Sequence, residues 1–197
     1  MERKDGSKFF NKYNIKWVLT ITIWTFILAI IFSILSENLV KNLNLLFAFF
    51  TLNIIIIIGI IFDIIGIAIT RAEEKPFHSM ASKRIKEARI AIYLIRNAGP
   101  VSNFCNDVVG DISGIISGAI GANLIYKLIR IYNFKNSTLL SILITASTAA
   151  LTVGGKALGK SIALIHYETI IIKLSQFINL IENTFKINLV KNKKNKK

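Results

Sequence analysis

The chain has 197 residues, 53% of which are hydrophobic, and its formal net charge at pH 7 is +14. The apolar fraction exceeds the roughly 45–50% of soluble domains, and the apolar residues gather in runs of about 20, long enough to cross a bilayer as helices. The basic residues gather at the two ends and between Arg71 and Arg96, without the aromatic-lined groove typical of nucleic-acid binding, and a lone Cys105 excludes an intrachain disulfide and a cysteine-based metal cluster.

Residues 1–16 are polar and basic, and an apolar run over 17–36 follows them. A basic start before an apolar run is also typical of a signal peptide. Here the run is about 20 residues long, and no small-residue cleavage site follows it. We therefore predict a basic cytoplasmic N-terminal segment and a retained transmembrane helix over 17–36.

A second apolar run covers residues 45–70 and includes five consecutive isoleucines over 54–58. β-branched residues are poor helix formers in water, but inside a bilayer the backbone must satisfy its own hydrogen bonds, so a helix is favoured. Asp63 lies about two turns before Arg71, near the end of this run. Two interpretations stay open for it: an interfacial carboxylate that reaches the head groups, or a functional group within the membrane.

The segment over 71–100 is the longest polar stretch of the chain. From 79 to 97 its apolar residues recur with a period near 3.6, and charged residues occupy the other side. This pattern predicts an amphipathic juxtamembrane helix over 79–97. Gly99 and Pro100 end that helix and begin the next element.

The third run, over 101–125, is predicted to be the polar centre of the protein. Asn103, Asp107 and Asp111 are spaced four apart, so they share one face of a helix. Carboxylates on a membrane helix are costly, and they usually face a protein interior, a cavity or an ion path.

The fourth run, over 138–163, consists mostly of Ala, Ser, Thr and Gly in its middle. Small residues let membrane helices approach closely, and the natural partner for this run is the ladder of Gly110, Gly114 and Gly118 on the third.

Apolar residues recur at intervals of three and four over 166–190, which predicts a second amphipathic juxtamembrane helix before the basic tail over 191–197. We thus predict an all-α, polytopic membrane protein with about four transmembrane helices and two juxtamembrane helices. The basic segments predict that both termini are cytoplasmic, with the protein in the plasma membrane. Lys127, Arg130 and Lys135 then fall outside, against the usual charge rule.

Residues 154–161 read GGKALGKS and match the phosphate-binding pattern Gly-x-x-x-x-Gly-Lys-Ser. That motif requires a strand before its loop and an α/β domain around it, whereas here a small-residue membrane run precedes it. We therefore reject nucleotide binding. Since no paired histidines and no nucleophile–base pair are visible, we predict no enzymatic activity.

Residues 45–181 resemble, in order, the transmembrane domain of the CorB/CorC/CNNM family of magnesium and cobalt transport or efflux proteins. Four stretches carry the resemblance: FDIIGIAIT at 62–70, AIYLIRNAGP at 91–100, GDIS at 110–113 and GKALGKSIA at 155–163. They are similar, in the same order, to the family patterns FSASEIALT, A-x-x-VLxLLENPxRF, GNTLVN and GEIxPKxxA. Relative to that family, we expect an added first span and no cytosolic CBS pair.

This resemblance implies a homodimer with a Mg²⁺ site between its spans, and the missing CBS pair leaves a place for a separate soluble regulatory partner. The oxygen ligands that Mg²⁺ prefers would come from Asp63, Asn106, Asp107, Asp111 and Ser113. Lys156 stands where the family has a glutamate, and its amine would repel a cation or neutralise a carboxylate. Two functions stay open: transport of Mg²⁺ or Co²⁺, or a transport-inactive scaffold or regulator in which Lys156 replaces the cation.

Overall fold

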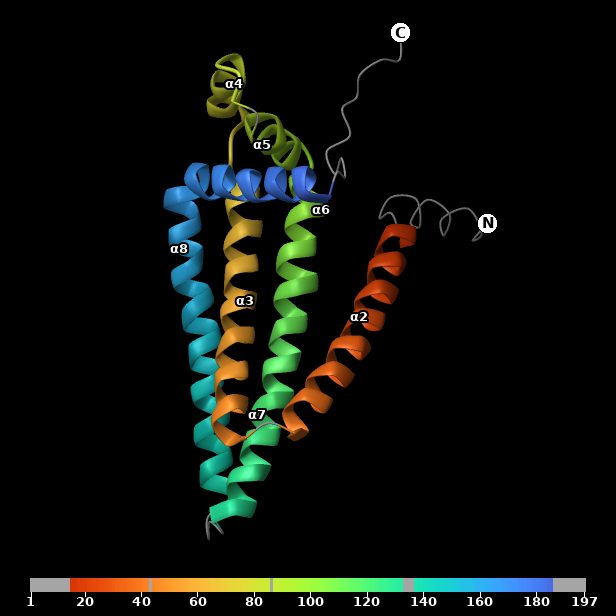
Figure 1. Cartoon of the computed structure of the whole chain (residues 1–197), viewed down its shortest axis with the longest axis vertical. Helices are drawn as coiled ribbons and strands as arrows, with labels where there is room; N and C mark the ends of the chain where they lie inside the picture. The colour runs from red at the N-terminus through yellow and green to blue at the C-terminus, as the bar shows by residue number, and fades with distance from the viewer. Residues whose placement is uncertain (1–14, 43, 86, 133–136, 186–197) are drawn as a thin grey trace, which may run out of the picture.

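The computed structural model describes residues 15–42, 44–85, 87–132 and 137–185, and within these ranges its regular elements are all helices, with no strand. This confirms the predicted all-α class. In chain order the elements are α2 (Ile15–Asn42), α3 (Leu45–Arg71), α4 (Glu74–Ser82), α5 (Glu87–Arg96), α6 (Ala98–Asn103), the π-helix η1 (Phe104–Gly110), α7 (Asp111–Tyr132) and α8 (Ser137–Phe185) (Figure 1).

Three helical stretches are long and apolar enough to cross a membrane: Leu45–Arg71, Ala98–Tyr132 and Ser137–Phe185. The second of these joins α6, η1 and α7 into one rod (Figure 1). The described part of α2 contributes only a shorter apolar stretch, Val18–Ile31. A fourth span over 17–36 therefore stays a prediction.

A kink at His166 divides α8 into two halves. His166 has φ −111° and ψ 23°, outside the helical region. The first half runs upright beside α3, and the second half lies across the end of the bundle (Figure 1). Ile171 and Ser175 of this second half are buried, whereas Phe177 and Leu180 are exposed. One face of the crossing helix is therefore buried, but the exposed face also carries large apolar side chains, so the predicted amphipathic helix over 166–190 stays a prediction; residues 186–190 lie outside the described ranges.

Two short helices, α4 and α5, stand where the periodicity predicted one helix over 79–97. Arg84, between them, has a positive φ of 61°, which is uncommon for a residue other than glycine. The chain thereby leaves the helical path after α4, and the two helices pack against each other. Phe77 of α4 is fully buried, because it joins the apolar cluster that α5 and the second half of α8 form over the end of α3. The burial of Phe77 depends on contacts with distant parts of the chain, so the periodicity of the sequence did not predict the break between α4 and α5.

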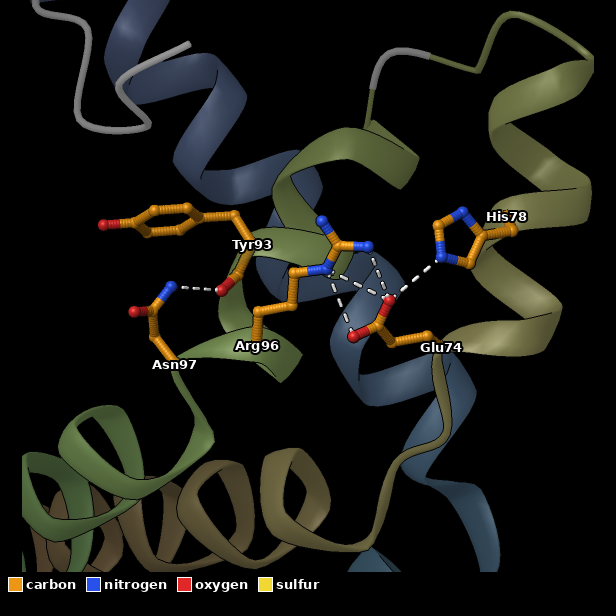
Figure 2. Close-up of polar contacts among 5 residues, drawn as sticks. All are labelled: Glu74, His78, Tyr93, Arg96 and Asn97. Carbon is orange, nitrogen blue, oxygen red and sulfur yellow. Dashed lines mark hydrogen bonds and ion pairs between the residues drawn. The ribbon is translucent and has the colours of Figure 1, made fainter. Parts of the chain in front are cut away.

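An ion-pair cluster ties the start of α4 to the end of α5 (Figure 2). Arg96 donates to the carboxylate of Glu74 from Nε at 3.1 Å and from Nη2 at 3.0 Å, and Nε2 of His78 lies 2.9 Å from Oε2 of Glu74. These hydrogen bonds, first from Arg96 and then from His78, lower the pKa of Glu74 below its ordinary value of 4.5. The ionised carboxylate therefore favours the docked arrangement above that value, and its contribution is lost as the pH falls through the lowered pKa.

Replacing Glu74 by glutamine is expected to loosen α4. The neutral amide gives Arg96 and His78 a weaker partner, so backbone amides of α4 should exchange with deuterium a few-fold faster, a small effect because the pair is exposed to water. Hydrogen exchange followed by mass spectrometry measures this directly. Glu73→Gln is the matched control, since Glu73 is exposed and forms no ion pair within the described residues. Equal exchange in the two variants would contradict the assignment.

Candidate functional site

Three of the five predicted ligand residues lie along one seam, where α3 packs against η1 and α7. A Cβ built on Gly59 of α3 would lie 2.9 Å from Cβ of Ser113 and 3.5 Å from its Oγ. A Cβ built on Gly66 would overlap the side-chain amide of Asn106. The two glycines therefore let the backbones of α3 and the facing rod approach closely. Asp63 is half-buried and shares this face of α3, because it follows Gly59 by four residues and precedes Gly66 by three.

Asn106 presents an unsatisfied acceptor to the seam. Its Oδ1 is buried and has no hydrogen-bond partner in the described part of the chain. Buried polar atoms are nearly always hydrogen-bonded, because an unpaired acceptor loses its water without compensation. Ser113, one level further along, is buried, and its hydroxyl donates to the Val109 carbonyl oxygen at 2.7 Å. The oxygen of this hydroxyl can therefore still accept a hydrogen bond or coordinate a metal ion.

The π-helix η1 contains Asn106 and Asp107, and Asp111 follows it directly. Residues 104–110 form one wide turn between the α-helical parts of the rod. Such turns occur frequently at functional sites, because they change which residues face a neighbouring helix. Here Asn106 contacts Gly66 of α3, whereas Asp107 and Asp111 are exposed. The spacing of four placed Asp107 and Asp111 on one face, but it did not show that Asn106 is the residue that meets α3.

Lys156 lies on α8, which packs against α3 and α7. Its neighbours Gly155 and Gly159 pack against isoleucines of α3; a Cβ built on Gly159 would lie 2.7 Å from Cγ1 of Ile64. Lys156 itself is half-buried, and its Nζ would lie 3.6 Å from a Cβ built on Gly110. It forms no ion pair with any residue in the described ranges.

The structure thus brings Asp63, Asn106 and Ser113 to one seam and leaves Asp107 and Asp111 at the surface. The residues that it describes contain no group of three or more His, Cys, Asp and Glu able to hold a metal ion. Of the three residues at the seam, only Asp63 carries a carboxylate; Asn106 and Ser113 contribute neutral oxygens. The metal-ligand set inferred from the family resemblance therefore stays a prediction.

The predicted pairing of the glycine ladder with the small residues of α8 needs correction. A Cβ built on Gly114 or Gly118 would meet nothing within 4 Å. Both glycines line an open groove of about 270 Å³, whose other wall is α8 from Thr145 to Val153. The glycines of α8 that pack closely instead face α3. Sequence reasoning missed Gly59 and Gly66, although their spacing of seven places them on one helix face.

Residues 154–161, which match the phosphate-binding pattern, lie inside the continuous helix of α8. Comparison of the chain with models of protein families, with curated proteins and with solved structures gave no significant match. Evidence for function therefore comes from the seam, from the charges around it and from the resemblance described above.

Proposed function

We propose that this protein is a multi-pass membrane protein that carries a divalent cation, Mg²⁺ or Co²⁺, across the bilayer through the seam between α3 and η1–α7. The observation that carries the proposal is the buried, unpartnered Oδ1 of Asn106. An acceptor in this position is stabilised by a cation or by a water molecule bound to one. The resemblance of residues 45–181 to a family of cation transporters supports the same function.

Depth in the membrane agrees with this role. Asp63 precedes the end of α3 at Arg71 by eight residues, which at about 1.5 Å per residue places it about 12 Å inside the helix end. A hydrocarbon core is roughly 30 Å thick, so the seam lies well within it. A carboxylate held at that depth marks an ion path more often than a structural contact.

The proposed site offers Mg²⁺ only a few protein oxygens. Asp63 supplies a carboxylate, Asn106 an amide oxygen and Ser113 a hydroxyl oxygen, while Asp107 and Asp111 supply negative charge from the outer face of the rod. Mg²⁺ keeps several of its waters when proteins bind it, so two or three protein oxygens suffice.

We propose that the end of the bundle that carries α4, α5 and the crossing half of α8 faces the cytoplasm. Lys83, Arg84 and Arg89 are exposed there. Loops rich in lysine and arginine are retained on the cytoplasmic side of a membrane.

A transport-inactive scaffold or regulator is the second candidate, and Lys156 favours it. Its amine lies beside Gly110, next to the seam, with no carboxylate partner in the described chain. A fixed positive charge in that position opposes the entry of a cation. In this function the amine would take the place of the ion.

Uptake of Mg²⁺ or Co²⁺ into proteoliposomes tests the two candidates. For a transporter, we expect uptake above that of empty vesicles, lowered roughly tenfold or more by Asp63→Asn and by Asn106→Leu, since loss of a ligand or its support weakens metal sites by about that factor. Asn53→Leu is the control, because the Asn53 amide already donates to the Phe49 carbonyl oxygen within α3 at 2.8 Å.

The pattern of results separates the candidates. Wild-type uptake that equals that of empty vesicles, together with uptake by Lys156→Glu, would favour the scaffold. No uptake by any variant would end the transport proposal. Equal uptake by the wild type, Asp63→Asn and Asn106→Leu would place the ion path elsewhere in the protein.

A further inference from the structure

The start of α3 and the last turns of α7 meet at the end of the bundle opposite α4 and α5 (Figure 1). Between them lies a pocket of about 660 Å³. Asn44 and Leu45 line it from the start of α3. From α7 it is lined by polar and charged residues, which include Asn123, Tyr126, Lys127 and Arg130. Spacings of three and four place these residues on one face of α7, so that face carries polar chemistry at the end of an apolar helix.

Positive charge gathers at this pocket. Arg130 is exposed and forms no ion pair in the part of the chain that the structure describes. Lys127 adds a second positive charge to the lining. Residues 38–62 and 112–167 include the neighbouring turns of α3, α7 and α8, and they contain no Asp or Glu. Because these turns offer the pocket no carboxylate, its lining attracts an anion from outside the chain.

The pocket lies at the level of the lipid head groups. It is at the ends of α3 and of the rod, and both of these are long enough to cross a membrane. Tyr126 and Tyr132 are exposed at this level. Tyrosine is enriched at the membrane–water interface, because its ring is apolar and its hydroxyl is polar. The phosphate groups of the lipids lie at the same level, where long basic side chains reach them.

Apolar side chains complete the pocket. Leu45 and Ile131 belong to its lining. Phe49, one turn further along α3 and on the same face as Leu45, is exposed. A molecule that fills the pocket therefore meets charge at the helix ends and apolar surface toward the middle of the membrane. An anionic amphiphile matches both parts, whereas a free phosphate ion would leave the apolar part uncovered.

We propose that this pocket binds the head group of an anionic phospholipid. The Arg130 guanidinium pairs with the phosphate, because its planar fork of donors matches two phosphate oxygens. Lys127 adds positive charge, and the amides of Asn44 and Asn123 are available as hydrogen-bond donors to the head group. The acyl chains lie along the apolar surface that includes Phe49. A bound anionic lipid also accounts for basic residues at an end of the bundle where the usual charge rule disfavours them.

This inference rests on the membrane location in the proposed function but not on cation transport. The proposed cation ligands Asp63, Asn106 and Ser113 are far from the pocket. From Leu45 to Asp63, α3 rises about 27 Å at about 1.5 Å per residue. Lipid binding and cation uptake are measured separately, so either proposal can fail alone.

Tryptophan quenching by brominated lipids measures which lipids lie beside the pocket. The full-length chain carries Trp17→Phe and Trp24→Phe, so that Phe49→Trp supplies its only tryptophan. It is reconstituted into vesicles of phosphatidylglycerol, which is anionic, and phosphatidylcholine, which is zwitterionic, with one or the other brominated. We expect a several-fold preference for phosphatidylglycerol. Equal quenching by the two lipids would overturn the proposal, and no quenching by either would overturn the membrane location together with it.

Arg130→Gln tests the residue assigned to the phosphate. Loss of one positive charge beside anionic lipid should lower the preference for phosphatidylglycerol about fivefold. Arg130→Lys keeps the charge and should keep most of the preference, which also shows that the position tolerates substitution. Arg89→Gln is the matched control, because Arg89 is exposed on α5, at the other end of the bundle. A preference that Arg130→Gln leaves unchanged, or that Arg89→Gln lowers equally, would overturn the proposal.

A comparison of two salts separates a lipid head group from free phosphate. In sodium phosphate and in sodium chloride of equal ionic strength, the preference for phosphatidylglycerol should be the same, because a free phosphate ion gains nothing from the apolar part of the pocket. If phosphate abolished the preference at an ionic strength where chloride preserved it, the pocket would be a site for the free ion and the lipid proposal would be overturned.

Discussion

Substitution of Gly59 by alanine is expected to destabilise the bundle by about 1–3 kcal/mol, the usual cost of overpacking a close contact. A methyl group at this position would lie 2.9 Å from Cβ of Ser113, closer than two such carbons approach. Cβ of Ser113 cannot move without its backbone, so α3 and α7 must separate. Unfolding of the purified protein in mixed micelles, titrated with a denaturing detergent, measures the change in the free energy of unfolding.

Gly114→Ala is the matched control for this prediction, measured on the monomer in detergent. Gly114 lies on α7, and a methyl group there meets nothing within 4 Å. The free energy of unfolding should stay the same or rise by up to about 1 kcal/mol, because alanine is a better helix former than glycine. If Gly59→Ala were as stable as Gly114→Ala, the close approach of α3 and α7 would be contradicted.

Substitution of Gly66 by alanine is expected to cost about 1–3 kcal/mol as well, but for a different and reversible reason. The new methyl group would occupy the space of the Asn106 amide, which is the end of a side chain rather than backbone. Asn106→Ala vacates that space. In the Asn106→Ala background, Gly66→Ala should therefore lower the free energy of unfolding by less than about 0.5 kcal/mol. A change of that size is within the scatter seen between sites that do not interact.

The double-mutant cycle on Gly66 and Asn106 measures their coupling directly, and transport by the same variants reports on the site. Gly66→Ala alone displaces the amide and should lower cation uptake together with stability. The double variant should recover stability without recovering uptake, because it lacks the amide oxygen. Gly154→Ala, at a position with open space around it, controls for the change from glycine to alanine. If the two substitutions changed the free energy of unfolding additively, the contact between Gly66 and Asn106 would be contradicted.

Helix α3 lies at the centre of the bundle and packs against both other long helical stretches. Its first half packs on α7 in one apolar cluster, which includes Leu52 and Ile56. Its last turns pack under α4, α5 and the crossing half of α8 in a second cluster, which includes Ala68 and Ile69. The stretch between the clusters, 59–66, carries the two seam glycines and Asp63. Polar chemistry is thus confined between two apolar layers.

The helical class and the positions of the long apolar helices followed from the sequence. Apolar runs at 45–70, 101–125 and 138–163 correspond to α3, to the rod of α6, η1 and α7, and to the upright half of α8. This success has a simple cause: a long apolar run must satisfy its backbone locally, and only a helix does so within one segment. The polar residues proposed for the site could also be identified from the sequence, because a carboxylate or amide is unusual within an apolar run.

Tertiary structure alone decided which of those candidates meet. Asn106 faces α3 and Asp107 is exposed, as expected of two neighbours that point to different sides of a helix. Spacing shows that the two face apart, but only the packing of the rod against α3 decides which of them meets that helix. The partners of the glycines were also hidden, because Gly59 and Gly66 acquire their role only from the side chains that another helix places against them. Length and polarity are local properties and could be predicted, whereas helix rotation and contact are set by long-range packing.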